Sequence, residues 1–324
     1  MIKFKDKTIK KLISKRQINN LNSIAFISSP LQMICLKELL FYKSINNLKV
    51  VIVNKNDYDD NVNQIKKVAE NLQIHISNIF IHNKRLSYFK LFFKYALRKE
   101  NILILGAYYN SVFYFLSKII NYKKLLFVDD GLETAFIGRL NVTNEFLTNK
   151  IFKWKYPSSR MHFSAFKDLD INYFSQNNFL FIKKRIKFKT INNSIFLLGS
   201  NFIESDMLTF DQYQYYIKKI KNRYSSKNIF YLPHRREDAS NFSRYGIEIL
   251  KPEVCFEVYL SLIESLPKCI IGFYSTALIT SKIILSENDK VEIINVPIKF
   301  NENDDERKNI YNEVLIKNKI KNIF

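Results

Sequence analysis

The chain has 324 residues, 47% of them apolar and 25% charged, a composition that is typical of globular proteins and excludes a disordered chain. The length is enough for two domains. Lys and Arg number 51 and Asp and Glu 30, so the formal net charge of +21 favours an anionic partner: phosphate, nucleic acid, acidic glycan or membrane surface. The three cysteines form no CxxC pair and no HExxH motif occurs, so we expect reduced thiols, no metal site and a cytoplasmic protein.

Along the chain, short apolar runs alternate with segments of helical periodicity. The predicted strands are residues 24–27, 49–53, 102–105, 124–128, 194–198, 228–232, 268–271 and 291–294, several of them apolar on both faces. The predicted helices are residues 32–42, 62–72, 111–119, 211–224, 254–264 and 277–285. The alternation predicts an α/β fold, and the basic, then polar stretch 182–194 divides it into domains 1–185 and 186–324. We expect two Rossmann-like domains that face a central cleft, where ligands usually bind.

Three segments bear on membrane association. Residues 102–120 are apolar enough to suggest a membrane span, but Gly106, Asn110 and Lys118 interrupt them, which favours a strand, a turn and an amphipathic helix. The first twenty residues are basic and polar, without the apolar stretch of a signal peptide. This end and residues 312–324 are amphipathic and fit either helices packed on their domains or peripheral attachment to the inner face of the cytoplasmic membrane, the location we expect.

Two adjacent aspartates follow a predicted strand in the stretch Val128-Asp129-Asp130-Gly131. Neighbouring side chains of a strand point to opposite faces, so this pair is unsuited to sharing one metal ion. A carboxylate at the carboxyl end of a parallel strand is well placed to act as a general base, and Gly131 suits a sharp turn after it. An Asp-Gly turn with a helix cap is the structural alternative.

Two stretches of the second half suit an anion. His234 follows a predicted strand and precedes Arg235 and a second arginine, a setting that favours contact with a phosphate. Ser275 and Thr276 follow Gly272 at the start of an apolar helix, where hydroxyls, free N–H groups and the helix dipole bind anions. A structural histidine and an ordinary helix cap are the alternatives.

A further polar residue of the second half fits a nucleotide. Glu257 lies between the histidine and the Ser-Thr pair and is either a ligand of a ribose diol or an ordinary first-turn glutamate. A histidine, two hydroxyls and a helix N-terminus together neutralise a departing phosphate without a metal ion.

In order and spacing these motifs resemble the bacterial sialyltransferases, the superfamily of glycosyltransferase families 38, 52 and 80. The shared marks are the acidic pair before glycine at 129–131, the histidine beside a proline at 233–234, and the Ser-Thr pair after a glycine-containing strand at 275–276. CFEVYLSLIESLPKCIIGFYSTAL, residues 255–278, is similar to the family's Phe-Glu…Leu-Pro…Gly…Ser-Ser region, and FISSPLQMICLKELL, residues 26–40, to the opening of family 52, the lipooligosaccharide sialyltransferases. One departure is that Pro233 precedes the histidine, whereas the family's proline follows it.

The resemblance implies a GT-B fold, CMP-sialic acid as the donor, no cofactor and an inverting, metal-independent transfer. It implies that Asp129 is the general base that deprotonates the acceptor hydroxyl, although the sequence alone leaves Asp130 open. His234 would bind or protonate the departing CMP phosphate, the hydroxyls at 275–276 would hydrogen-bond that phosphate, and Glu257 would hold the cytidine ribose. Asn201, in the loop after the first strand of the second domain, would line the nucleotide site.

Several alternatives concern the acceptor and the class of protein. We expect a hydroxyl of a cell-surface glycan as acceptor, such as a terminal galactose of lipooligosaccharide or a capsule. Elongation of polysialic acid, which suits the positive charge, and transfer of another CMP-activated acid such as Kdo are the alternatives within this class. A non-catalytic nucleic-acid-binding protein is a distant alternative, and we expect no nucleic-acid partner because no RNP-like or helix-turn-helix signature accompanies the basic composition.

Overall fold

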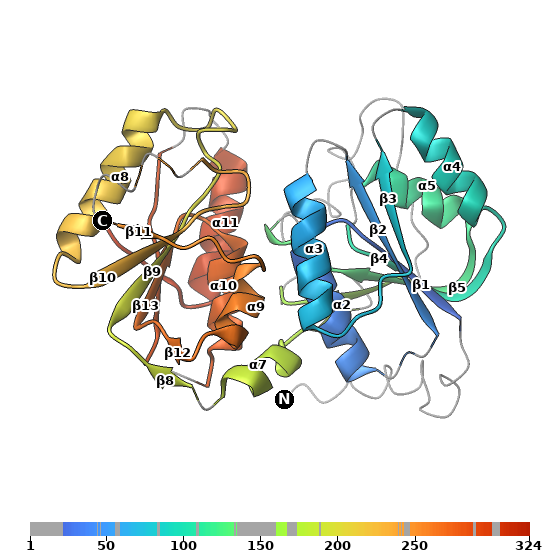
Figure 1. The fold of residues 1–324 in the computed structure, drawn as a ribbon, viewed down its shortest axis with the longest axis horizontal. Coiled ribbons are helices and arrows are strands. Elements are labelled where there is room, and N and C mark those ends of the chain that lie inside the picture. Colours follow the sequence, from blue (N-terminus) through green and yellow to red (C-terminus); the bar gives the residue numbers. More distant parts are fainter. Residues whose placement is uncertain are drawn as a thin grey trace. The chain divides into compact units, whose positions relative to one another are not determined.

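The computed structural model describes residues 22–43, 45, 47–55, 59–82, 85–107, 110–132, 134, 160–166, 174–187, 189–238, 240, 242, 247–287, 290–299 and 305–324. The chain forms two compact units, each built on a parallel sheet (Figure 1). Unit 1 contains the residues up to Asp130 and later segments that end at Asn177, and unit 2 contains the residues from Asn178 onward with short segments that begin at Gly131 and Ala165. The expected boundary at 185/186 lies within helix α7 (Leu180–Ile186) of unit 2.

Among the described residues, unit 1 has a seven-stranded sheet in the order β3-β2-β1-β4-β5-β6-β7, in which all neighbours are parallel. Its strands are β1 (Ser23–Ile27), β2 (Leu48–Lys55), β3 (Asn78–His82), β4 (Lys99–Leu105), β5 (Asn121–Val128), β6 (Met161–Ser164) and β7 (Phe174–Gln176). Its helices are α2 (Pro30–Tyr42), α3 (Asp59–Asn71), α4 (Arg85–Tyr95) and α5 (Ser111–Ile119). Figure 1 shows α2 and α3 on one face of the sheet and α4 and α5 on the other, as right-handed crossovers require.

Unit 2 has, within its described part, a six-stranded sheet in the order β11-β10-β9-β13-β14-β15, also parallel throughout, and a two-stranded ribbon of β12 and β8. Its strands are β8 (Thr190–Ile191), β9 (Ser194–Leu198), β10 (Asn228–Leu232), β11 (Glu248–Ile249), β12 (Ser265–Leu266), β13 (Cys269–Gly272), β14 (Glu292–Asn295) and β15 (Lys321–Asn322). Besides α7, its helices are α8 (Phe210–Arg223), α9 (Phe256–Leu262), α10 (Thr276–Ile284) and α11 (Asp305–Lys317).

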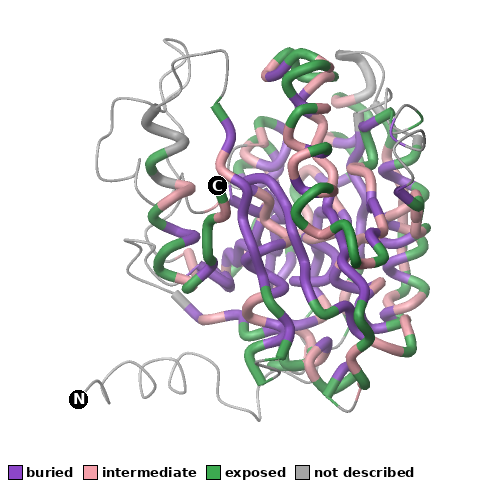
Figure 2. The backbone as a smooth tube through the Cα atoms, turned by 90° about the vertical axis from the view of Figure 1, so that its left-hand side faces the viewer, coloured by how far each residue is buried: buried purple, intermediate pink, exposed green. Residues whose placement is uncertain are grey.

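The core of each unit is centred on one strand that is buried along its whole length. Every residue of β1, sequence SIAFI, and of β9, sequence SIFLL, is buried. Such strands are apolar on both faces because helices cover both faces of the sheet. Figure 2 shows purple tubes, the buried residues, in the middle of the view and green and pink segments around them. Polar side chains are therefore concentrated at the strand ends.

The expected α/β fold class with two Rossmann-like sheets is confirmed. All eight predicted strands and all six predicted helices are present, with ends shifted by a few residues; residues 102–105 belong to β4 and residues 111–119 form α5. Strands β3, β6, β7, β8, β11, β12 and β15 and helices α4 and α7 were not predicted, and α11 was predicted only as one of the two alternatives for residues 312–324. Across the described part of the chain, no helix combines the length and apolar character needed to span a membrane.

The basic C-terminal segment is part of the unit 2 fold. Helix α11 buries Val314 and Leu315, Ile320 is buried after it, and β15 pairs with β14. The segment thus matches the alternative of an amphipathic helix packed on its domain. The basic N-terminal residues 1–21 lie outside the described residues.

Two neighbouring residues of α11 allow a test of its packing, because one is buried in the core and the other is exposed at the surface. Leu315 is 1% exposed and Ile316 is 65% exposed. We expect Leu315→Ala to lower the free energy of unfolding of unit 2 by ~2–4 kcal/mol, because it leaves a cavity in the core. The matched control Ile316→Ala should change it by less than about 0.5 kcal/mol. Chemical denaturation measures both, and equal effects would contradict the packed arrangement of α11.

Candidate functional site

In unit 1, the two aspartates lie where β5 ends, at the carboxyl edge of the parallel sheet. Asp129 is buried, whereas Asp130 is partly exposed. The Nε2 atom of Gln32, in the first turn of α2, donates a 2.6 Å hydrogen bond to Oδ1 of Asp130. The loop after β1 and the loop after β5 are thereby joined, although 98 residues separate the two side chains along the chain.

Both polar atoms of the Gln32 side-chain amide, the oxygen and the nitrogen, form hydrogen bonds. Its Oε1 atom accepts hydrogen bonds from the N–H and the hydroxyl of Ser28, at 2.7 and 3.2 Å. Ser29 caps α2 by accepting from the N–H of Gln32, and a proline follows at the first helical position. A β-carbon on Gly106, which follows β4, would overlap the Gln32 amide, so a side chain at this position requires that amide to move. With Oε1 committed to Ser28, the NH2 group is oriented toward Asp130.

At Gly131 the chain enters unit 2 with φ of +78°, a conformation that glycine adopts without strain. A β-carbon there would lie 2.7 Å from Oγ1 of Thr276. The next residue, Leu132, donates its N–H to the same oxygen at 2.9 Å. Thr276 therefore accepts from the loop that follows the aspartates, and this bond does not use its own O–H, which can donate to an anion.

The start of α10 is fixed by hydrogen bonds from two directions. Ser275 is the N-cap, and its Oγ accepts from the N–H of Ala277 at 3.2 Å. Tyr274, with a positive φ of 45°, donates its N–H to Oδ1 of the buried Asn295 at 2.8 Å. Gly272 ends β13 just before this turn. The predicted helix cap is present at Ser275, and the same N-terminus offers free N–H groups to an anion.

The histidine loop rests on a buried chain of hydrogen bonds. Glu237 accepts from the Tyr231 hydroxyl at Oε1 and from the His234 N–H at Oε2, the latter at 2.9 Å. The Tyr231 and Tyr213 hydroxyls lie 3.0 Å apart, and Tyr213 accepts from the N–H of Ser200 at 3.2 Å. Through Tyr231 and Tyr213, this chain of hydrogen bonds links Glu237 in the loop after β10 to Ser200 in the loop after β9.

The ionisation states within this chain follow from burial. Burial raises the pKa of Glu237 to about 8, although the hydrogen bonds from Tyr231 and His234 favour the charged form. Burial, aided by Arg235 and Arg236, lowers the pKa of His234 to about 4. At neutral pH the imidazole is therefore uncharged, and because Nδ1 accepts from the N–H of Arg236 at 3.3 Å, the hydrogen resides on Nε2. Nε2–H is a donor for an anionic ligand.

The other predicted donor-binding residues have different surroundings. Glu257 is buried, and its Oε1 accepts a 2.7 Å hydrogen bond from the Thr280 hydroxyl, which links α9 to α10. Burial raises the pKa of this carboxyl. Asn201 follows β9 and is half-buried. Its backbone carbonyl accepts hydrogen bonds from the N–H and the hydroxyl of Ser205. Contact of Glu257 with a ribose stays a prediction.

Topology brings the unit 2 candidates to one edge. Strand β9 lies between β10 and β13, and all three run parallel, so the loops that carry Asn201, His234 and Ser275 leave the sheet side by side. The chain moves from β9 to β10 in one direction and from β13 to β14 in the other. The crevice at such a reversal of strand order is the usual ligand site of an open parallel sheet.

Two residues with a supporting role in this geometry were not singled out from the sequence. Gln32 stands in the stretch SSPLQ and Glu237 in HRRED, but their partners are distant residues. The sequence feature that could have identified Gln32 was its place in a family-like motif. For Glu237 the feature was the position of an acidic residue directly after two arginines.

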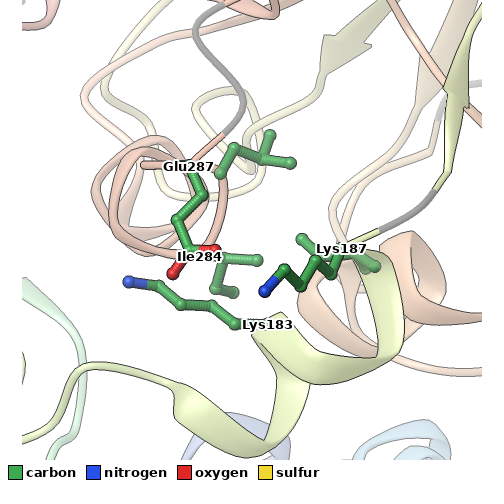
Figure 3. Close-up of a pocket in the computed structure, with 6 residues that line it drawn as sticks. Lys183, Lys187, Ile284 and Glu287 are labelled. Atoms are coloured by element: carbon green, nitrogen blue, oxygen red, sulfur yellow. The ribbon is translucent and has the colours of Figure 1, made fainter.

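Neither a metal cluster nor the small pocket of Figure 3 coincides with these residues. The described residues contain no group of three or more His, Cys, Asp or Glu side chains that could hold a metal ion. In Figure 3 the side chains of Lys183, Lys187 and Glu287 converge on a surface hollow of unit 2. Its lining comprises Lys183, Ile186, Lys187, Ile284, Leu285 and Glu287, none of them a predicted site residue.

Comparison with known proteins supports the fold. No protein-family model and no curated protein sequence matches the chain. The UDP-GlcNAc 2-epimerase of Methanocaldococcus jannaschii, solved with UDP-GlcNAc and UDP, is 13% identical over 92% of this chain and 91% of its own, with a TM-score of 0.55. A protein of Listeria monocytogenes assigned as a UDP-N-acetylglucosamine 2-epimerase is 10% identical over 92% and 88%, with a TM-score of 0.51. At these identities the likeness establishes an α/β fold of the GT-B type, with two parallel-sheet units.

Glu237 makes the stability of unit 2 depend on pH. The folded protein keeps the carboxyl proton up to pH about 8, whereas the unfolded chain loses it near the ordinary value of 4.5. The contribution of this carboxyl to the free energy of unfolding should therefore fall as pH rises from about 5 to about 8, by at most ~1.4 kcal/mol per unit. His234, whose pKa is lowered from 6.5 to about 4, contributes in the opposite sense below pH 6.5, so the slope due to Glu237 is measured between pH 6.5 and 8. Glu237→Gln should flatten this slope, whereas the exposed control Glu248→Gln should retain it. Denaturant titrations at four pH values measure the slopes, and an unchanged slope in Glu237→Gln would contradict the raised pKa.

Proposed function

We propose that the chain is an inverting, metal-independent sialyltransferase that moves sialic acid from CMP-sialic acid to a hydroxyl of a cell-surface glycan. The observation that carries this proposal is the set of anion-binding groups on adjacent loops at the carboxyl edge of the unit 2 sheet. These groups are the Nε2–H of His234, the Ser275 and Thr276 hydroxyls, and the N-terminus of α10. They match, in type and order, the groups that the family resemblance assigns to the donor phosphate.

On the donor side, the chemistry required is stabilisation of a leaving phosphate. A neutral His234 donates a hydrogen bond from Nε2, and a phosphate dianion beside it would raise the pKa of the imidazole and favour the protonated form, which can transfer its proton to the departing phosphate. The exposed Arg235 adds positive charge. Preorganised donors of this kind stabilise charge that develops in the transition state. In this proposal Glu257 binds the cytidine ribose and Asn201 lines the nucleotide site.

On the acceptor side, a carboxylate removes the proton of the attacking hydroxyl. The motif assigns this role to Asp129, whereas accessibility favours Asp130, whose carboxylate is oriented by Gln32. The two aspartates have separate environments, one buried and one bound to an amide, which supports a base rather than a shared metal ligand. Nucleophilic attack by the deprotonated hydroxyl on the side opposite to the CMP leaving group inverts the anomeric centre.

The nature of the donor rests on two different kinds of support. The Methanocaldococcus jannaschii epimerase binds UDP-GlcNAc on a similar fold, which supports a nucleotide sugar in general. The choice of CMP-sialic acid rests on the sialyltransferase-like motifs of this chain. Elongation of polysialic acid is the alternative that a specific observation favours, because the net charge of +21 suits a polyanionic acceptor.

The deciding experiment measures release of CMP from CMP-sialic acid by the purified chain, with lactose, lipooligosaccharide and oligosialic acid as acceptors. CMP-Kdo and UDP-GlcNAc serve as competing donors. We expect transfer from CMP-sialic acid, unaffected by EDTA. Loss of activity with EDTA, restored by Mg²⁺ or Mn²⁺, would exclude the metal-independent mechanism, and preference for another donor would replace the proposed substrate.

Substitution of the aspartates identifies the base. We expect Asp129→Asn to lower transfer by ~100-fold or more while CMP binding stays unchanged, the usual scale for loss of a general base. Asp130→Asn is the matched variant. It keeps the hydrogen bond from Gln32 only if the new asparagine turns its side-chain oxygen, and not its nitrogen, toward Nε2 of Gln32. If Asp130→Asn is inactive and Asp129→Asn active, the base is Asp130. If both retain full activity, the proposed base mechanism is wrong.

Substitution of Gln32 tests its contact with Asp130. Gln32→Glu places a second carboxylate beside that of Asp130 and should raise its pKa, because neighbouring like charges disfavour ionisation. If Asp130 is the base, the acidic limb of the pH–rate profile should therefore move to higher pH, by about one unit, whereas it should stay in place if Asp129 is the base. Gln32→Leu, which carries no charge, serves as the control and should lower kcat without this movement. Identical profiles for wild type and Gln32→Glu would show that Asp130 does not titrate in the reaction.

A further inference from the structure

Helix α4 of unit 1 exposes large apolar side chains to solvent. Phe89 is 57% exposed, Phe93 80% and Leu97, just after the helix, 86%. Their spacing of four residues places them on one side of the helix. Leu91 and Tyr95 are buried and supply the packing of α4 on its unit. The exposed residues therefore add nothing to the core, and we call them, with Lys90 and Lys94, the α4 face.

The α4 face continues onto the neighbouring helix. The rings of Phe92 and Phe115, from α4 and α5, lie 5.9 Å apart, and Phe115 is itself 39% exposed. Single exposed apolar residues are common on proteins, but a contiguous group on two packed helices marks an interaction surface. Figure 1 shows α4 and α5 on the face of the unit 1 sheet opposite to α2 and α3.

The charge around this group has one sign. Residues 85–120 contain Arg85, Lys90, Lys94, Arg98, Lys99 and Lys118 and a single acid, Glu100. Lys90, Lys94 and Lys99 are exposed, whereas Glu100 is buried. Lysines beside exposed phenylalanines are complementary to a surface that is negatively charged outside and apolar beneath, as an anionic bilayer is. A purely polar polyanion leaves the phenylalanines in water.

We propose that the α4 face docks unit 1 on an anionic phospholipid bilayer, with Phe89, Phe93 and Leu97 inserted at the interface and the lysines among the headgroups. This inference goes beyond the proposed function, because it requires neither sialyl transfer nor any residue of the candidate site. It places attachment on the folded body of the protein, in addition to the basic N-terminal residues and in place of the packed C-terminal segment.

The test is sedimentation of the full chain with vesicles. Wild type should bind vesicles that contain phosphatidylglycerol and phosphatidylethanolamine, and bind neutral phosphatidylcholine vesicles weakly. Phe89→Ser with Phe93→Ser should lower the partition coefficient by about tenfold or more, because the apolar contribution to interfacial binding scales with buried area. Tyr215→Ser with Ile316→Ser removes side chains of similar exposure, 59% and 65%, from unit 2 and is the matched control, which should bind like wild type.

A second double variant separates the electrostatic contribution to vesicle binding from the apolar one. Lys90→Glu with Lys94→Glu should weaken binding at low salt far more than at high salt, because surface charges are screened within about 8 Å at physiological ionic strength. Both α4 variants should keep wild-type CMP release with a soluble acceptor. A failure of docking therefore remains distinguishable from a failure of the proposed enzyme function.

Several outcomes overturn the proposal. The α4 face is not the docking site if the double phenylalanine variant sediments like wild type, if the unit 2 control loses equally, or if deletion of residues 1–21 alone abolishes binding. A wild-type protein that does not sediment with anionic vesicles refutes the proposal directly. If wild type is a dimer that Phe89→Ser with Phe93→Ser converts to a monomer, and vesicles do not bind, the face is a self-association surface instead.

Discussion

Parallel pairing of a central strand with a neighbour on each side is the constraint on which both units depend. In unit 1, β1 pairs with β2 and β4, and in unit 2, β9 pairs with β10 and β13. Because helices cover both faces, these strands are apolar throughout and functional groups are confined to strand ends. On the two sides of each central strand the connections run in opposite directions, so the loops at the carboxyl ends of neighbouring strands separate and leave room for a ligand. In unit 2, Asn201, His234 and Ser275 occupy these loops, whereas the aspartates of unit 1 follow β5, which pairs with β4 and lies one strand away from β1.

Buried polar side chains give these loops fixed positions. In unit 1, both ends of the Gln32 amide are used, one by Ser28 and one by Asp130. In unit 2, Glu237 accepts from Tyr231 and from the backbone of His234. Removal of a buried polar group from water is unfavourable unless hydrogen bonds replace those to water, so each network is stable only when complete. The same completeness gives the loops one preferred geometry, which preorganises groups that must meet a substrate.

The sequence was informative where a segment is buried on both sides or where a helix has one apolar stripe. Strand β15 escaped prediction because its two residues are polar and contribute only backbone pairing to β14. Helix α4 escaped because Phe89 and Phe93 add apolar residues to its exposed side, which removes the helical period. Asp130, His234 and Ser275 were identifiable as polar residues after apolar strands. Their supports, Gln32 and Glu237, were not, since those contacts exist only after distant loops come together.

Close approach between glycines and polar side chains limits how this sequence can vary. Gly106 leaves the volume that the Gln32 amide fills, and Gly199 leaves the volume that the Glu237 carboxylate fills. A side chain at either glycine is compatible with the fold only if its polar partner becomes smaller in the same lineage. Substitution of either glycine therefore requires a change of its partner, and a laboratory search that changes single positions will find the glycines intolerant although each pair can be exchanged together.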